Sequence, residues 1–249
     1  MKLTIVGCAG SYPTADSPAS CYLVEHEGSR ILLDMGNGSF GALQQYVDIV
    51  WPGALDAVVL SHCHLDHCAD LGSLYVQKHY YSPPSERLIV VGPSNARSRA
   101  VGIYGKEDEA GLDHEFAFAT FTREPMEIGP FTIEALRAVH PVEAYSVRVS
   151  AGGRSITYSG DTAINDRLIA LAGETDIALF EASFVGTDFP PNVHMSAREA
   201  GRAAREAGAS MLVVTHHVVM NDPAVVLAEA TAEFGGPIEQ AYPGMTVSI

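Results

Sequence analysis

Histidine and aspartate gather in one short segment of the chain, His62-Cys63-His64-Leu65-Asp66-His67. Imidazole and carboxylate groups without thiolates suit Zn, Mn or Fe, and we expect Zn first among them. His62 and His64 alternate, so both project from one face of an extended segment, whereas Asp66 and His67 fall on the turn that follows. Two pairs arranged in this way can hold two different divalent ions. A polar loop that is merely rich in histidine is the competing interpretation.

Residues of the same kind follow apolar segments elsewhere in the chain, at the point where each segment ends. The four transitions run from Leu60 to His62, from Val139 to His140, from Tyr158 to Asp161 and from Val214 to His216. Strand ends are rigid and converge at one edge of a sheet, which suits a preorganised metal site. The predicted metal-binding residues are His62, His64, Asp66, His67, His140, Asp161 and His216.

Short β-rich segments and helical patterns alternate around these residues. The predicted strands are Leu3–Val6, Tyr22–Glu25, Ile31–Asp34, Ala57–Leu60, Leu88–Val91, Phe131–Val139, Tyr145–Val149, Ser155–Tyr158, Asp176–Glu181 and Met211–Thr215. The predicted helices are Cys68–Tyr80, a helix that Ser196 and Glu199 begin with a capping box and Gly208 ends, and Pro223–Phe234. Residues 101–115 show no clear pattern and are interpreted as a flexible loop over the site.

Composition indicates one α/β domain over residues 1–249, because 47% hydrophobic and 18% charged residues can bury a large core. No apolar run approaches the roughly 18 residues that a membrane span needs, and Met1–Gly7 is too short for a signal peptide. A cytoplasmic location is therefore expected. Cys8 and Cys21 are interpreted as buried reduced thiols, whereas Cys63 and Cys68 lie beside the metal motif and could line the site.

The formal net charge of −15, with only 15 basic residues, disfavours binding to polyanions. Proteins that bind long nucleic acids gain affinity from clusters of Lys and Arg, and this chain has no strong cluster. Bound cations would offset the charge locally, so a small anionic substrate remains compatible. The partners considered are such a substrate and a second copy of the chain in a homodimer. Long nucleic acid and a membrane are not expected.

Taken in order, the motifs resemble those of the metallo-β-lactamase superfamily: His62-x-His64-x-Asp66-His67, His140, Ser159-Gly160-Asp161-Thr162 and Thr215-His216. The resemblance covers nearly the whole chain. It implies an αββα sandwich, in which two mixed β-sheets are flanked by helices and the metals lie at one edge. It also implies how the two metals are held. His62, His64 and His140 would bind one ion, Asp66, His67 and His216 the other, and Asp161 would bridge them.

Within this superfamily the chain looks closest to ribonuclease Z and the related small bacterial phosphodiesterases. Asp161 rather than Cys stands at the bridging position, Glu181-Ala182-Ser183 matches that branch, and His194 matches its extra histidine. The histidine motif also resembles a signature of class II cyclic-nucleotide phosphodiesterases. Ribonuclease Z has a long arm that grips transfer RNA, and a hairpin fills the segment from His140 to Asp161 where many members insert it. Transfer-RNA processing and β-lactam hydrolysis are therefore disfavoured.

The predicted catalytic residues are His194 and Asp66. His194 is the candidate general acid for the leaving alkoxide. It lies two residues before a helix N-cap, a position that disfavours imidazolium in the empty site. Asp34 either hydrogen-bonds a ligand imidazole from behind or forms a turn before Gly36. His217 is expected to point away from the site, and three further histidines are interpreted as surface residues: His26, His79 and His114.

The leading function is hydrolysis of small phosphodiesters such as cyclic nucleotides. A lactone or thioester hydrolase is one alternative, since the same metal chemistry attacks acyl carbon, and a ribonuclease Z-like RNA 3′-processing nuclease is another. A redox di-iron protein is disfavoured because those relatives usually carry Glu at the position of Cys63 and a fused flavin domain. A scaffold without catalysis is disfavoured because all seven predicted ligands are present.

Overall fold

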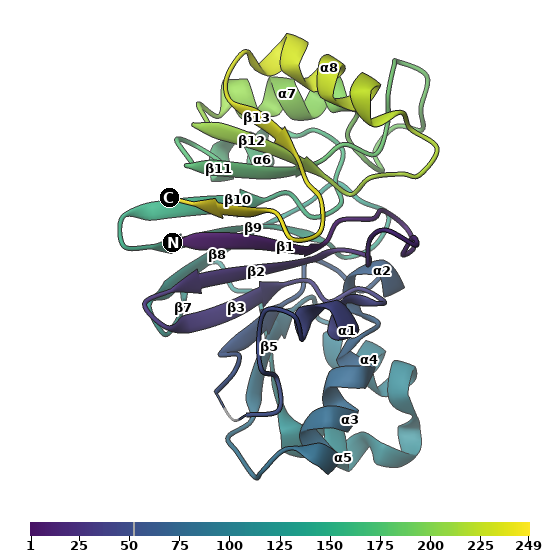
Figure 1. The fold of residues 1–249 in the computed structure, drawn as a ribbon, viewed down its shortest axis with the longest axis vertical. Coiled ribbons are helices and arrows are strands. Elements are labelled where there is room, and N and C mark those ends of the chain that lie inside the picture. Colours follow the sequence, from purple (N-terminus) through teal and green to yellow (C-terminus); the bar gives the residue numbers. More distant parts are fainter. Residues whose placement is uncertain (52) are drawn as a thin grey trace.

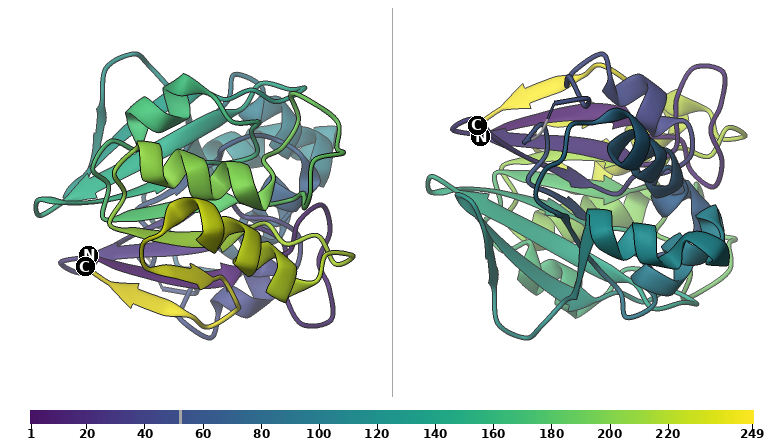
Figure 2. Two further views of the ribbon diagram at one scale, coloured as in Figure 1. Left: turned by 90° about the horizontal axis from the view of Figure 1, so that it is seen from above. Right: turned by 90° about the horizontal axis from the view of Figure 1, so that it is seen from below.

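Two β-sheets lie face to face in this chain, and helices cover the outer side of each (Figures 1 and 2). The structure is a computed structural model that describes residues 1–51 and 53–249. The layers follow the order helix, sheet, sheet, helix, so the expected αββα sandwich is confirmed.

The first sheet has the strand order β14-β1-β2-β3-β4-β5-β6. Its strands are β1 (Lys2–Gly7), β2 (Cys21–His26), β3 (Ser29–Leu33), β4 (Ala57–Val59), β5 (Leu88–Gly92), β6 (Phe116–Thr120) and β14 (Thr246–Ser248). The strands β1, β2 and β3 pair antiparallel, whereas β3 to β6 pair parallel, so the sheet is mixed. In the parallel part, the carboxyl ends of β3 and β4 reach the same edge.

The second sheet has the strand order β13-β12-β11-β10-β9-β8-β7. Its strands are β7 (Met126–Ile128), β8 (Phe131–Arg137), β9 (Tyr145–Ala151), β10 (Arg154–Tyr158), β11 (Ile177–Glu181), β12 (Met211–Thr215) and β13 (Ile238–Gln240). The predicted hairpin of β9 and β10 is confirmed. From β10 to β13 the strands pair parallel, so the carboxyl ends of β10, β11 and β12 also meet at one edge.

Helices pack on the outer face of each sheet (Figure 1). The first sheet carries α1 (Ser39–Leu43), α2 (Leu65–Cys68), α3 (Leu71–Tyr81), α4 (Ala96–Tyr104), the 3₁₀ helix η1 (Lys106–Asp108) and α5 (Glu109–Glu115). The second sheet carries α6 (Asp166–Leu171), α7 (Ala197–Glu206) and α8 (Pro223–Phe234). In the part of the chain that the structure describes, no helix combines the length and apolar character that crossing a membrane requires.

Alternating side chains of the strands divide the core into an inner layer and two outer layers. In β3, Ile31 and Leu33 face the second sheet, whereas Leu32 faces the helices of its own side. In β12, Val213 lies between the sheets and Leu212 packs against the outer helices. Because side chains alternate along a strand, a strand buried on both faces needs apolar residues at consecutive positions. This explains the continuous apolar runs in the sequence.

Two expectations about helices are wrong in detail. Residues 101–115 are not a loop, since they form the end of α4, then η1 and α5. The helix predicted over Cys68–Tyr80 begins three residues later, as α3, because Cys68 ends α2 and Asp70 is the N-cap of α3. The capping box of Ser196 and Glu199 at the start of α7 is confirmed.

Candidate metal centre

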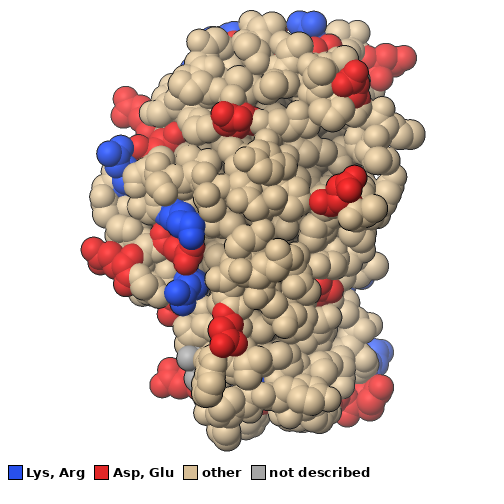
Figure 3. Space-filling model, viewed as in Figure 1, with Lys and Arg blue, Asp and Glu red and all other residues tan. Residues whose placement is uncertain are grey.

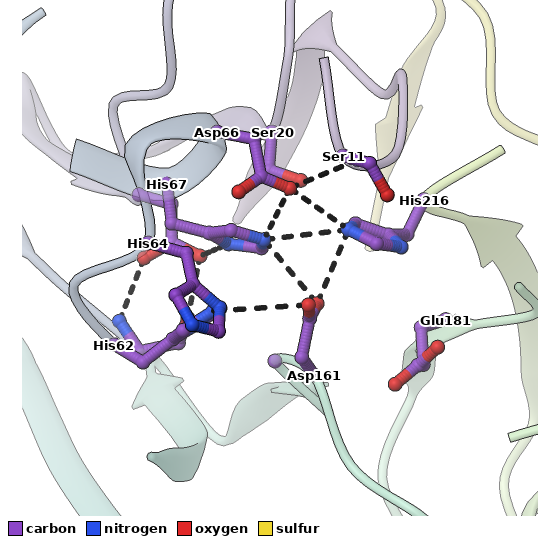
Figure 4. A network of polar contacts seen from close by, with 12 residues as sticks. Ser11, Ser20, His62, His64, Asp66, His67, Asp161, Glu181 and His216 are labelled. Atoms are coloured by element: carbon purple, nitrogen blue, oxygen red, sulfur yellow. Dashed lines mark hydrogen bonds and ion pairs between the residues drawn. The ribbon is translucent and has the colours of Figure 1, made fainter. Parts of the chain in front are cut away.

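All seven predicted metal-binding residues meet at one edge of the sandwich. Figure 4 labels all of them except His140. His62 and His64 follow β4, and α2 carries Asp66 and His67. The other three each follow a strand of the second sheet: His140 after β8, Asp161 after β10 and His216 after β12. The site therefore depends on both sheets, and the facing strand ends bring residues together that are far apart in sequence.

Two groups of these side chains can each surround an ion, and Asp161 belongs to both. Within each group, one ligand-type atom per residue lies within 4.8 Å of the others. We call the fully buried group the inner cluster; it consists of Asp66, His67, Asp161 and His216. We call the other group, in which two histidines are partly exposed, the outer cluster; it consists of His62, His64, His140 and Asp161.

In the inner cluster, carboxylate oxygens and imidazole nitrogens converge on one point. Asp161 Oδ1 lies 3.3 Å from Nε2 of His67 and 3.3 Å from Nε2 of His216. Asp66 Oδ2 lies at the same distance, 3.3 Å, from both nitrogens. It also accepts a hydrogen bond of 2.9 Å from the backbone N–H of Ser11. Burial opposes the charge, but the contacts with His216 and His67 hold the pKa of Asp66 well below its usual range.

In the outer cluster, three imidazoles face one another. Nδ1 of His64 lies 3.0 Å from Nε2 of His62 and 3.3 Å from Nε2 of His140. Asp161 Oδ2 is 3.7 Å from Nε2 of His62. Burial, together with the positive charge that a protonated His67 would carry, holds the pKa of His62 well below its usual range. His62 is therefore neutral and has a lone pair available.

Four of these histidines have a hydrogen-bond partner on the nitrogen that faces away from the centre. Such partners set the ring orientation and the tautomer of a metal-binding histidine. In all four the contact is made by Nδ1. Its partners are Ser61 Oγ for His62 (3.1 Å), Asp34 Oδ2 for His67 (2.7 Å), the Val193 carbonyl for His140 (2.8 Å) and Ser183 Oγ for His216 (2.8 Å). In each case Nε2 is left to face the centre.

Asp34 holds the inner cluster from behind, as one of its two predicted roles requires. Its side chain is fully buried and also accepts hydrogen bonds from the Ser61 backbone N–H (2.6 Å) and the Tyr158 hydroxyl (2.7 Å). Burial opposes charge on His67, but Asp161 and Asp34 raise the pKa of His67 well above its ordinary value. The backbone of Asp34 is left-handed, with φ of 59°, and Asp and Asn tolerate that conformation better than most residues.

His194 pairs with a carboxylate whose role the sequence did not reveal. Its Nδ1 lies 3.0 Å and 3.1 Å from the two oxygens of Glu181 and 3.8 Å from Asp161 Oδ2. Burial disfavours imidazolium, but the hydrogen bond and charge of Glu181 outweigh it and raise the pKa of His194 to about 9. The expectation that imidazolium is disfavoured at this position in the empty site is therefore wrong. Glu181 ends β11, so it fits the strand-end pattern that identified the other residues.

Other residues that the sequence singled out lie away from the centre. Cys63 and Cys68 do not line the site, because both are buried in the apolar cluster between the first sheet and its helices. His217 points away, as expected, and its Nε2 contacts the Ala241 carbonyl at 2.9 Å. His79 and His114 are exposed, as expected, and Nδ1 of each lies 3.0 Å from Oε1 of Glu115.

Comparison with known proteins places the chain in a family. Residues 29–217 match the family model described as "Beta-lactamase superfamily domain". An uncharacterized protein of Mycobacterium leprae (strain TN) is 38% identical, with 100% of this chain and 89% of that protein covered. The probable metallo-hydrolase YhfI of Bacillus subtilis (strain 168) is 33% identical over 98% of both chains. Its crystal structure covers 99% of both chains with a TM-score of 0.88 and 30% identity.

A further relative in sequence is ribonuclease Z of Myxococcus xanthus (strain DK1622), 28% identical over 100% of this chain and 98% of that enzyme. The chain therefore belongs to the metallo-β-lactamase superfamily, in its ribonuclease Z-like branch. It is a metal-dependent hydrolase.

Proposed function

We propose that two divalent metal ions bind at this centre, one in each cluster, and that Asp161 contacts both. The donor set supports this assignment, because unprotonated imidazole nitrogens and carboxylates suit Zn, with Mn or Fe as alternatives. Asp161 Oδ1 supports it further. This oxygen is buried between two imidazole nitrogens and has no hydrogen-bond partner among the described residues. A buried acceptor without a partner costs stability, and a bound cation removes that cost.

We further propose that the enzyme hydrolyses small phosphodiesters, cyclic nucleotides among them. When bound, two divalent ions supply Lewis acidity and lower the pKa of water. His194 provides the proton that a leaving alkoxide needs, because Glu181 lies 3.0 Å from its Nδ1 and raises its pKa. The carboxylate of Asp66 holds the neighbouring side of the site in place. It accepts a hydrogen bond from the Ser11 backbone N–H and contacts Nε2 of His67 and of His216. The His194–Glu181 pair is the observation that carries this proposal, since acyl transfer needs less help with its leaving group.

Size and charge favour a small substrate over long RNA. The segment between His140 and Asp161 is filled by the β9–β10 hairpin, which leaves no protruding arm there. On the face drawn in Figure 3, Lys and Arg side chains mostly lie beside Asp and Glu instead of forming a patch of their own. The pairs of Lys2 and of Arg30 with Glu25 are examples. With a net charge of −15, long polyanions are repelled.

Turnover of a substrate panel tests the proposal. Bis(p-nitrophenyl) phosphate, 2′,3′- and 3′,5′-cyclic nucleotides, a lactone and precursor transfer RNA are each incubated with enzyme loaded with Zn, Mn or Fe. We expect the small phosphodiesters to be cleaved far faster than precursor transfer RNA at physiological salt. Faster turnover of the lactone would make acyl chemistry the function instead. Accurate and efficient 3′ processing of the transfer RNA would overturn the argument from charge and the hairpin.

A further inference from the structure

A cavity lies beside the segment that carries His64 and Asp66, because Leu65 of that segment is one of its lining residues. It lies between α2 and α4 and has a volume of about 610 Å³. Its lining residues are Leu65, Ala69, Asn95, Ser98, Arg99, Gly102 and Ile103. Leu65 stands between His64 and Asp66 in the chain, so one wall of the cavity is the metal-binding segment itself. The other wall is tied to the loop after His140 through the hydrogen bond of Ser94 to Glu143.

Arg99 is the one basic residue among those that line this cavity. Its guanidinium makes no hydrogen bond or ion pair within residues 1–51 and 53–249. Arg97, two positions earlier in α4, is by contrast held by Glu109 at 2.7 Å and by Asp113 at 2.6 Å.

The lining has the chemistry that suits a heteroaromatic ring. Leu65, Ala69, Gly102 and Ile103 supply apolar surface, while Asn95, Ser98 and Arg99 supply hydrogen-bonding groups. A site for phosphate alone would instead present several cations or converging backbone N–H groups. Cavities that bind small molecules are mostly apolar, have a few placed polar groups and measure about 300–1,000 Å³. Arginine is also a common partner of the ring nitrogens and carbonyl oxygens of nucleobases.

We propose that the cavity between α2 and α4 binds the nucleobase of a nucleotide substrate whose phosphodiester lies at the metal centre, and that Arg99 hydrogen-bonds that base. This inference rests on the proposed phosphodiesterase function and names the part of the substrate that does not react. Binding energy from a remote group of this kind holds the reacting group in position.

Two substrates with the same leaving group test the inference. Thymidine 5′-(p-nitrophenyl phosphate) and methyl p-nitrophenyl phosphate both release p-nitrophenolate, but one of them carries a base. We expect the wild type to prefer the thymidine ester in kcat/KM. Arg99→Ala should lower kcat/KM for that ester by about tenfold or more and leave the methyl ester unchanged, because the lost hydrogen bond involves a charged donor.

A second variant and a matched control distinguish base binding from general electrostatics. A Cβ at Gly102 would meet no heavy atom within 4 Å, so Gly102→Leu fills the cavity without disturbing α4 and should also reduce turnover of the thymidine ester selectively. Arg97→Ala removes the same charge from the same helix outside the cavity and should change neither substrate. Equal losses on both substrates in Arg99→Ala, or no loss on either, would overturn the inference.

Binding of thymidine 5′-monophosphate by calorimetry separates this inference from the proposed function. If the wild type cleaves neither ester, the phosphodiesterase proposal fails, and binding alone then decides whether the cavity accepts a base. Saturable binding that Arg99→Ala weakens and Arg97→Ala leaves intact supports the cavity. Absence of binding to the wild type, or equal binding to all three proteins, contradicts it.

Discussion

The inner and outer clusters share Asp161 but hold their other side chains differently. Every side chain of the inner cluster is buried, and its two histidines are backed by the buried side chains of Asp34 and Ser183. In the outer cluster His64 and His140 are partly exposed, and His140 is backed by a backbone carbonyl. The inner cluster is thus preorganised by the core, whereas the outer cluster is open toward solvent at His64 and His140.

This contrast suggests a division of roles between the two proposed metal positions. A position whose ligands are fixed by buried partners retains its ion firmly, because little order is lost when the ion binds. A position with exposed imidazoles exchanges its ion more readily and leaves room for substrate. We expect the inner ion to support the structure of the site and the outer ion to meet the substrate first.

The largest effect is expected where the two clusters meet. Asp161→Ala removes the one residue common to both, so elemental analysis should show both ions lost. Turnover of bis(p-nitrophenyl) phosphate should fall by roughly 10⁴-fold or more, because several kcal/mol of transition-state stabilisation accompany the metals. His216→Ala and His64→Ala should each lose about one ion, from the inner and the outer cluster respectively. Loss of no ion in His216→Ala would remove that residue from the proposed ligand set.

A substitution at His194 tests whether this residue protonates the leaving oxygen when the phosphodiester bond breaks. His194→Ala should keep both ions and the fold, and its rate should fall by roughly 10²–10⁴-fold on substrates with alkoxide leaving groups. With p-nitrophenolate, which departs without a proton, the loss should be much smaller. Because both substrates meet the same variant, changes in metal content cannot imitate the difference. Equal losses would mean that His194 positions the phosphate, and no loss on either would make it a bystander.

A substitution at Asp34 tests whether the buried hydrogen-bond partners of the inner cluster raise its affinity for metal. Asn tolerates the left-handed backbone at this position, so Asp34→Asn changes the hydrogen bond to His67 with little strain. The affinity of the inner position should fall by roughly 10–100-fold, the usual effect of losing such a partner, while the outer position changes less. Competition with a chelator measures both affinities. Weakening of the two positions by the same factor would contradict the distinction between the clusters.

The strand-end pattern predicted most of the site because it is a local signal. An apolar run followed by His or Asp predicts a ligand at the edge of a sheet without knowledge of the tertiary fold. His140 and His216 were identified in this way. Glu181 obeys the same rule, but a glutamate after an apolar strand is common. Its pairing with His194 depends on α7 packing beside β11, a tertiary contact that the sequence does not display.

Elements far from the centre were less predictable for the same reason. The strand β13 has three residues, and its partner β12 determines where it pairs. Residues 101–115 carry three glycines and many charged residues, yet α5 forms because Leu112 and Phe116 are buried against the first sheet. The single-domain organisation of residues 1–249, the cytoplasmic location and the homodimer stay predictions.

The smallest effect at neutral pH is expected from Glu181, which touches the inner cluster through Ser183 and stands beside the shared Asp161. Its charge raises the pKa of His194 to about 9 against the effect of burial, so His194 should remain a competent acid until the pH rises through that value. In Glu181→Gln, only the charge of Asp161 still opposes the effect of burial, and the pKa of His194 falls. The alkaline limb of kcat/KM for a 3′,5′-cyclic nucleotide should therefore move to lower pH, by more than about one unit.

The control for this shift is Glu199→Gln, because Glu199 lies in α7 and does not contact His194. Gln can replace Glu in a capping box, so the start of α7 is preserved. Its alkaline limb should stay where the wild type has it. Near pH 6 Glu199→Gln should turn over at a rate close to wild type, and the loss in Glu181→Gln should be smaller than at higher pH, because a larger share of His194 is then protonated. If the limb of Glu181→Gln does not move, a group other than His194 sets it, and the proton for the leaving oxygen comes from elsewhere in the centre.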